Sequence, residues 1–155
     1  MAKIERQVLV QSSKKPLVWK RYIDDVFSLW DTSTEKIEEF LGKANSFHLT
    51  ITFTAEISET AITFLDTKVY KGERFHKESF LDVQTHYKPT ETFQFTNFYS
   101  CHPPGVTKVF IKGEDLWLRR TNFSKETFAE NIKNLESRLK CRGYPTGVIK
   151  NTSQK

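Results

Sequence analysis

The sequence predicts an α+β fold in which β-hairpins and one helix are followed by a small group of helices. Short runs rich in Val, Ile, Phe, Tyr and Trp, which favour strands, recur through much of residues 17–100. Two prolines and a glycine in CHPPG, at 101–105, then interrupt this pattern. Apolar residues recur at helical spacing after that point. We therefore expect a lead-in at 1–16, a mainly β part at 17–100 and a helical part at 101–150.

Composition narrows the class of protein. The 155 residues suit one domain or a piece of a larger protein, and 13 Phe, 5 Tyr and 3 Trp are enough for a core. No apolar run approaches the ~18 residues of a membrane helix, and the N-terminus lacks the apolar segment of a secretion signal. Two distant cysteines do not indicate a disulfide framework. We expect an intracellular protein, nuclear or cytoplasmic, with no membrane partner.

The net charge of +5 is unevenly distributed along the chain. Residues 1–100 carry 13 Lys and Arg against 14 Asp and Glu, whereas residues 101–155 carry 11 against 5. A basic helical part beside a carboxylate-bearing part is typical of proteins that act on nucleic acid. The alternative, a solvated basic helix face without a partner, remains open.

The first expected element is a β-hairpin within LVWKRYIDDVFSLW, at 17–30. Two apolar, aromatic-rich arms at 17–23 and 26–30 favour strands, and the polar break between them places Asp24 and Asp25 at the tip.

A helix is expected next, within 31–47, because acidic residues fill its first turns and Ile37, Phe40, Leu41 and Ala44 have helical spacing. Residues 48–58 alternate apolar and polar side chains and predict a half-buried strand. That strand is expected to pair with a second strand within 59–75 through a turn at 58–60, and Lys71-Gly72 is expected to form another turn.

Two helices are expected after residue 105. The first contains Val106 to Leu118, with Gly113 interrupting it, and the second begins at Ser124 and ends at Gly143 and Pro145. The final NTSQK, at 151–155, is expected to fray.

The adjacent carboxylates of Asp24 and Asp25 suit a hard divalent cation. Mg²⁺ binds through one or two carboxylates together with substrate phosphates, and phosphoryl transfer with two metals needs such ligands on a rigid element. A polar turn without metal is the alternative. A zinc site from Cys101, His102, Cys141 and His86 is not expected, because their spacing matches no compact ligand pair.

The stretch RYIDDVF resembles the catalytic hairpin of reverse transcriptases, whose signature is Tyr-x-Asp-Asp between apolar strands. The acidic helix, ITFLDTKVYK, HYKPTET, SCHPPG and LRR follow in the order seen in reverse transcriptases of the Penelope-like retroelement family. The resemblance covers about residues 18–144. It implies the C-terminal part of a polymerase palm, with the primer-grip region, at 17–100 and a helical thumb at 101–150.

Residue roles follow from the same resemblance. Asp24 and Asp25 correspond to the catalytic, metal-binding pair, with Asp24 the direct Mg²⁺ ligand, and Tyr22 lies near nucleotide and template. The partners implied are an RNA template and a DNA primer. The thumb would hold the duplex by its phosphate backbone through basic side chains, for which we name Lys108, Lys112, Arg119, Arg120 and Lys125.

A polymerase palm also needs an aspartate on an earlier strand, and the 21 residues before Tyr22 contain none. We therefore expect a fragment of an RNA-directed DNA polymerase that is inactive alone and that an upstream polymerase half would complete. The alternatives are a non-catalytic nucleic-acid-binding module and an inert retroelement remnant.

Overall fold

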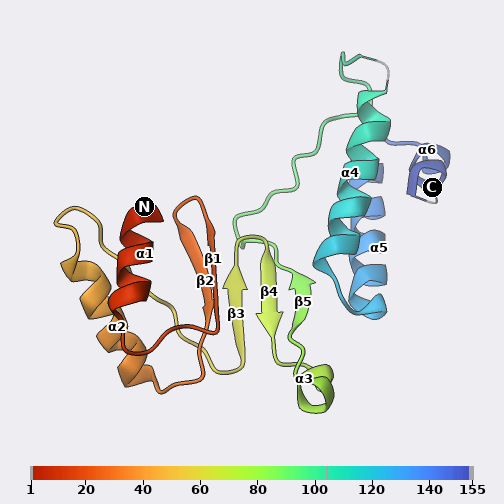
Figure 1. The fold of residues 1–155 in the computed structure, drawn as a ribbon. Coiled ribbons are helices and arrows are strands. Elements are labelled where there is room, and N and C mark those ends of the chain that lie inside the picture. The colour runs from red at the N-terminus through yellow and green to blue at the C-terminus, as the bar shows by residue number, and fades with distance from the viewer. Residues whose placement is uncertain (1, 104, 154–155) are drawn as a thin grey trace. The chain divides into compact units, whose positions relative to one another are not determined.

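The computed structural model describes residues 2–103 and 105–153 and has a mixed α+β fold, as expected (Figure 1). The chain divides into two compact units, Met1–Ile62 and Thr63–Lys155, which we call unit 1 and unit 2. Each is described by itself. Pro104 of the expected boundary and the last two residues of the expected frayed end lie outside the described residues.

Unit 1 contains the expected hairpin. Strands β1 (Val18–Tyr22) and β2 (Asp25–Leu29) are antiparallel, with Val18 opposite Leu29 and Tyr22 opposite Asp25. The expected helix is also present as α2 (Thr34–Ser46), which buries Ile37, Phe40 and Ala44. The prediction of both elements is confirmed, because local patterning and turn chemistry agree there.

Helix α1 (Ala2–Gln11) occupies the segment that the sequence suggested was a loose lead-in. Its Val8 is only 2% exposed and forms a small core with Phe40 and Ala44 of α2. Trp19 and Trp30, one from each arm of the hairpin segment, pack edge-on against Phe40 with ring centroids 5.8 and 4.8 Å away. Tertiary packing on α2 therefore stabilises a ten-residue helix that would be marginal in isolation.

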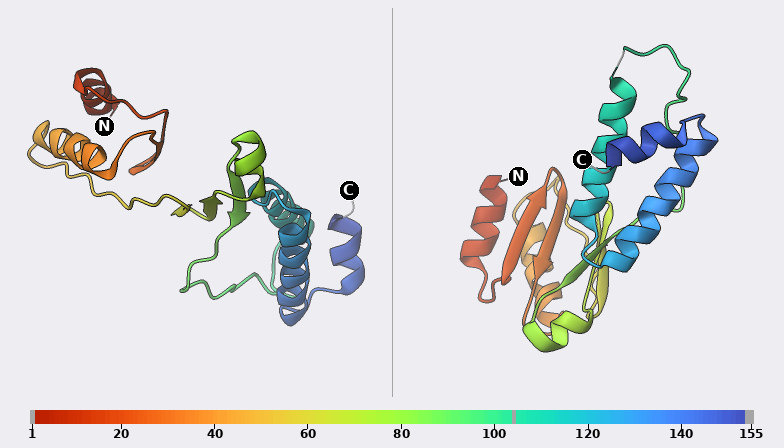
Figure 2. Two further views of the ribbon diagram at one scale, coloured as in Figure 1. Left: turned by 90° about the horizontal axis from the view of Figure 1, so that it is seen from below. Right: turned by 90° about the vertical axis from the view of Figure 1, so that its right-hand side faces the viewer.

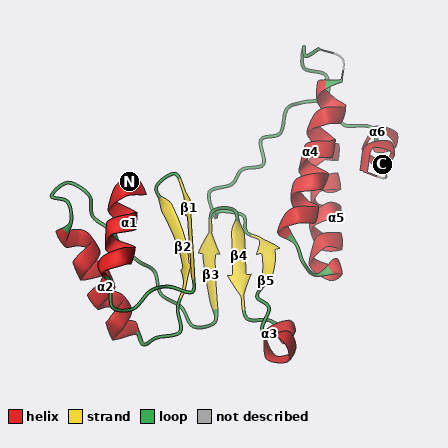
Figure 3. Cartoon of the chain, in the orientation of Figure 1, coloured by secondary structure: helices red, strands yellow, loops and turns green. Residues whose placement is uncertain are grey.

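The prediction of a strand at 48–58 is wrong. This segment is a loop in Figure 3, although Ile51 and Phe53 are half-buried between exposed threonines. The main chain of Phe53 bonds to a side chain instead of a strand: its N–H donates to Asn45 Oδ1 at 2.6 Å, and its carbonyl accepts from Asn45 Nδ2 at 3.0 Å. Apolar and polar side chains thus alternate in burial here, although this segment forms no strand pairing with the described residues.

Residues 59–75 form two strands rather than the single strand expected. Strands β3 (Ala61–Phe64) and β4 (Thr67–Tyr70) are joined by Leu65-Asp66, and Leu65 has a φ of 54°. Such a two-residue loop reverses the chain at once. The sheet has the order β3-β4-β5, and β5 (Asp82–Thr85) is antiparallel to β4. Helix α3 (Glu73–Glu78), which was not expected, connects β4 to β5.

Three helices complete unit 2: α4 (Val106–Thr121), α5 (Lys125–Cys141) and α6 (Thr146–Ser153). The first two confirm the prediction, except that α4 continues through Gly113 without a break. The third corrects the expectation of a frayed end for residues 151–153. Helices α4 and α5 lie side by side and α6 runs across them (Figure 2). Their shared core comprises Ile111, Leu118, Leu135, Leu139, Tyr144 and Ile149.

Buried polar contacts join the turn between α4 and α5 to β5. The Asn122 side chain accepts from the Thr85 N–H at 3.2 Å and donates to Thr85 Oγ1 at 2.6 Å. The Phe123 N–H donates to the Val83 carbonyl at 2.9 Å. Because unsatisfied buried polar groups are costly, this network fixes where the turn lies on the strand.

Capping fixes both ends of α5. Ser124 accepts the N–H groups of Glu126 and Thr127 at the first turn. At the other end the Tyr144 N–H donates to the Leu139 carbonyl and the Gly143 N–H to that of Lys140. These bonds form a Schellman motif, and its left-handed position is Gly143, with a φ of 85°.

No helix within residues 2–103 or 105–153 combines the length and the apolar character that crossing a membrane requires.

We expect Gly143→Ala to lower the free energy of unfolding by about 1–2 kcal/mol, because an alanine is strained at this φ. A Cβ there would also meet the Tyr99 ring at 3.1 Å, although that ring is exposed and able to move. Gly147→Ala is the control, since its Cβ would meet nothing within 4 Å. Urea unfolding measures both. Equal effects would contradict this account of the Schellman motif.

Candidate functional site

The tip of the β1–β2 hairpin carries the predicted metal ligands. Tyr22 and Asp25 face each other as the last pair of the ladder, and Ile23 and Asp24 form the two-residue loop between them. All four residues are exposed, with Tyr22 at 57% and Ile23 at 68%. The fold therefore brings together Tyr22, Asp24 and Asp25, as expected from the sequence.

The loop contains a strained residue. Ile23 has a φ of 55°, a left-handed conformation that is unusual for a β-branched side chain. Two-residue hairpin loops require positive φ at their first position, and glycine or asparagine usually supplies it. Strain of this kind costs on the order of 1–3 kcal/mol and clusters at functional sites. Leu65-Asp66 in unit 2 repeats the same combination, an apolar residue at positive φ followed by an aspartate.

The Arg21 side chain supports the loop through two polar contacts. Its Nη1 donates to the Ile23 carbonyl at 2.7 Å, and its Nε forms an ion pair with Glu5 Oε1 of α1, also at 2.7 Å. The Glu5 side chain is only 11% exposed, so screening by solvent is limited. One arginine thus connects the main chain at the tip to the helix that packs beneath the hairpin.

The candidate metal ligands that the tip provides are the two carboxylates of Asp24 and Asp25. Exposed carboxylates are the ligands that Mg²⁺ prefers, and one or two from the protein suffice when phosphates and water complete the shell. Within the described ranges no group of three or more His, Cys, Asp or Glu side chains could hold a metal ion. The donor set at the tip therefore fits a metal held jointly with a polyphosphate.

The predicted nucleic-acid contacts all lie in unit 2. Lys108, Lys112, Arg119 and Arg120 are exposed on α4, and Lys125 begins α5. At about 100° per residue, Lys108, Lys112 and Arg119 fall within about 40° of one another around the helix axis. Arg120 lies on a different side of α4. The fold therefore aligns three of the five cations in one stripe.

Arg119 is the most constrained member of this stripe. Its Nε donates to Asp115 Oδ2 at 2.8 Å, and its guanidinium lies 5.1 Å from the centre of the Phe128 ring. Asp115 is buried, at 6% exposed. Part of the charge of Arg119 is therefore neutralised within the protein, which leaves Lys108 and Lys112 as the stronger candidates for phosphate contacts.

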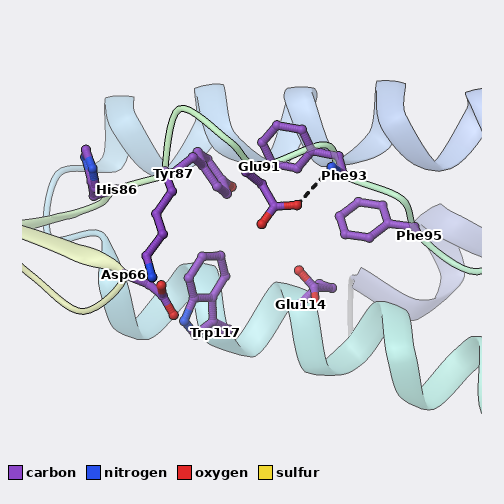
Figure 4. A pocket seen from close by; sticks show the side chains of 9 residues that line it. Asp66, His86, Tyr87, Glu91, Phe93, Phe95, Glu114 and Trp117 are labelled. Atoms are coloured by element: carbon purple, nitrogen blue, oxygen red, sulfur yellow. Dashed lines mark hydrogen bonds between the residues drawn. The ribbon is translucent and has the colours of Figure 1, made fainter. Parts of the chain in front are cut away.

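Unit 2 also contains a pocket that the sequence did not predict (Figure 4). Its volume is about 430 Å³, and it lies between α4 and the segment that follows β5. Its walls are formed by Asp66, His86, Tyr87, Lys88, Glu91, Phe93, Phe95, Glu114 and Trp117. Glu91 and Glu114 are far apart in the sequence and come close only in the folded chain. No sequence pattern therefore indicates that they are neighbours.

Two groups in the pocket have shifted pKa values. Burial raises the pKa of the Glu114 carboxyl above its ordinary 4.5, and the nearby negative charge of Glu91 raises it further. Burial also raises the pKa of the Tyr87 hydroxyl, against the opposing effect of the Arg138 charge.

Comparison with known proteins bears on unit 2 alone. Residues 94–154 match the family model described as the animal helix-turn-helix domain, and this match spans α4, α5 and α6. No curated protein matches the chain. No solved structure matches it either.

We expect Ile23→Gly to raise the free energy of unfolding by about 1 kcal/mol, because glycine relieves the strain at positive φ while an exposed side chain loses little burial. Val26→Gly, in the interior of β2, should lower it. Urea unfolding followed by tryptophan fluorescence checks both variants. A loss of stability in Ile23→Gly as large as in Val26→Gly would show that the loop is unstrained.

We expect Glu114→Gln to stabilise the protein at neutral pH. A raised pKa means that folding favours the neutral carboxyl, so its contribution is full below pH 4.5 and is lost as the pH rises through the folded-state value. The variant should therefore gain in urea midpoint over the parent chain between pH 5 and pH 8. Glu130→Gln, at an exposed position of α5, serves as the control. A gain that does not grow with pH would contradict this cause.

Proposed function

We propose that this chain is the C-terminal palm and thumb part of a reverse transcriptase similar to those of Penelope-like retroelements, and that it does not catalyse synthesis alone. The reaction of the parent enzyme would be RNA-directed DNA synthesis, a nucleotidyl transfer. The observation that carries the proposal is Tyr22-Ile23-Asp24-Asp25 across the hairpin turn, with both carboxylates exposed at the tip.

The contacts that hold the strained tip in place support the proposal more than the strain itself, because the Leu65-Asp66 turn has the same strain. A glycine or asparagine at position 23 would give the same turn without strain, yet the position holds an isoleucine. Arg21 and Glu5 supply the interactions that hold this conformation. A rigid support of this kind is what ligands for phosphoryl transfer need, because small displacements of a metal ligand weaken catalysis.

In this proposal each residue at the tip has a separate task. Asp24 would bind the catalytic metal directly, Asp25 would share or support it, and the ring of Tyr22 would lie beside the nucleotide or template. Mg²⁺, when bound, would neutralise charge on the polyphosphate during transfer. Arg21 would act by positioning the loop, without contact to the substrate.

The chain would need another polypeptide segment for activity. Polymerase chemistry with two metals requires ligands that face the hairpin from a second strand. Residues 1–21 contain no aspartate to provide one. An upstream polymerase half with its own palm aspartate would supply it, and residues 101–150 would act as the thumb that grips the template–primer duplex.

We expect weak Mn²⁺ binding at the tip and no primer extension by the chain alone. Paramagnetic Mn²⁺ should broaden the amide signals of Ile23 and Val26, and Asp24→Asn with Asp25→Asn should abolish the broadening. Asp31→Asn, an exposed aspartate outside the tip, is the control. The metal assignment fails if the double variant keeps the broadening.

A primer-extension assay with Mg²⁺ or Mn²⁺ tests the remaining part of the proposal. Template-dependent synthesis by the 155-residue chain that Asp24→Ala abolishes would refute the requirement for a second segment. Activity that appears only on addition of an upstream palm segment would support it.

The second candidate is a non-catalytic nucleic-acid-binding module. It is favoured by the helix-turn-helix match over residues 94–154, because such motifs place a helix against a duplex. Lys108 and Lys112, exposed on one stripe of α4, would contact phosphates in either candidate.

We expect salt-dependent duplex binding that survives loss of both tip aspartates. Lys108→Ala and Lys112→Ala should each reduce the slope of log affinity against log salt by about 1, the value for one lost phosphate contact. Lys36→Ala, at an exposed position of α2, is the matched control. Fluorescence anisotropy with an RNA–DNA duplex at several salt concentrations measures the slopes. Absence of binding at low salt would leave the inert remnant as the remaining alternative.

A further inference from the structure

The pocket of unit 2 is walled by aromatic rings. Tyr87, Phe93 and Phe95 come from the segment after β5, and Trp117 comes from α4 on the opposite side (Figure 4). The Tyr87 ring lies 5.0 Å from that of Phe93 and 6.0 Å from that of Trp117, both edge-on. Each ring therefore holds its neighbours at a fixed angle around the cavity.

Two carboxylates occupy the space between these rings. Figure 4 shows the side chains of Glu91 and Glu114 pointing toward each other across the cavity. Glu91 accepts the Phe93 N–H at 2.9 Å through one oxygen. The Glu114 carboxylate has no ion pair or side-chain hydrogen bond within the described part of the chain. Facing carboxylates repel each other, so a positive charge between them would be stabilised.

Two of these rings already contact a cation of the protein. The Arg138 guanidinium lies 3.1 Å from the centre of the Phe93 ring and 4.9 Å from that of Tyr87. The negative faces of aromatic rings attract such groups, and the attraction grows where water is excluded.

The charge around the pocket remains negative when this arginine is counted. Asp66, Glu91 and Glu114 contribute three carboxylates against the two cations Lys88 and Arg138. An anionic ligand such as a nucleotide phosphate is therefore disfavoured. A neutral nucleobase could stack on the rings but would leave the repulsion between Glu91 and Glu114 in place.

We propose that this pocket binds an organic cation, an alkylammonium or guanidinium group, with its apolar surface against the rings and its charge between Glu91 and Glu114. Inorganic cations are poorer candidates because they gain little from ring faces. The source of the group would be a small amine or a basic side chain of a partner protein. This binding is independent of the hairpin tip and of any polymerase role.

The test uses the full chain and tetramethylammonium, followed by the indole N–H signal of Trp117 in NMR spectra, which Trp117→Phe identifies among the three tryptophans. We expect a saturable shift of this signal. Glu114→Gln and Glu91→Gln should each weaken binding about tenfold, and Glu130→Gln should leave it unchanged. The thermal midpoint of each variant verifies that it is folded.

Two further probes separate the sources. Tighter binding of a peptide with trimethyllysine or arginine than of the free cation would indicate a protein side chain, whereas equal binding would indicate a small amine. The proposal is overturned if tetramethylammonium gives no saturable shift, or if neither glutamine variant weakens it. A shift with a neutral nucleoside and none with the cation would assign the pocket to a base instead.

Discussion

The packing of Trp19 and Trp30 against Phe40 is the contact on which the candidate metal site depends. A hairpin of two five-residue strands is marginal in water, so it needs a third element to hold one of its faces. Helix α2 supplies Phe40, and Val8 of α1 completes this core. The same arrangement places Glu5 of α1 where it pairs with Arg21, which in turn bonds to the Ile23 carbonyl. The position of the exposed tip is therefore fixed by the buried core of unit 1 and by the contacts of Arg21.

In unit 2, a buried apolar core and polar contacts likewise determine where the residues of interest lie. Its helices share one apolar core, while Asn122 and Thr85 fix the turn between α4 and α5 on β5. The segment after β5 then lies along α4 and brings Glu91 to Glu114. In unit 1 the polar groups of interest lie at a hairpin turn, whereas in unit 2 they come from helix α4 and from the segment after β5.

The sequence predicted the elements whose signals are local. The hairpin at Asp24 and Asp25, α2, α4 and α5 follow from periodicity, caps and turn residues. Features that depend on tertiary packing were missed: α1 requires the core around Val8, and the pocket requires contacts between distant segments. The turn at Leu65-Asp66 was missed because apolar residues rarely occupy such loops. The polymerase assignment, the metal and the duplex contacts are untested predictions.

The side-chain bonds between Asn45 and Phe53 have a consequence for the behaviour of the chain in solution. They occupy one residue of a stretch that otherwise alternates like a strand and presents main-chain donors and acceptors without a ladder over 51–58. A segment with strand-like alternation and free main-chain groups can pair with a strand edge of another molecule, and neither proline nor lysine interrupts this stretch. We therefore expect self-assembly of the chain at high concentration to begin at this segment, in which the Asn45 side chain satisfies the main chain of Phe53 alone.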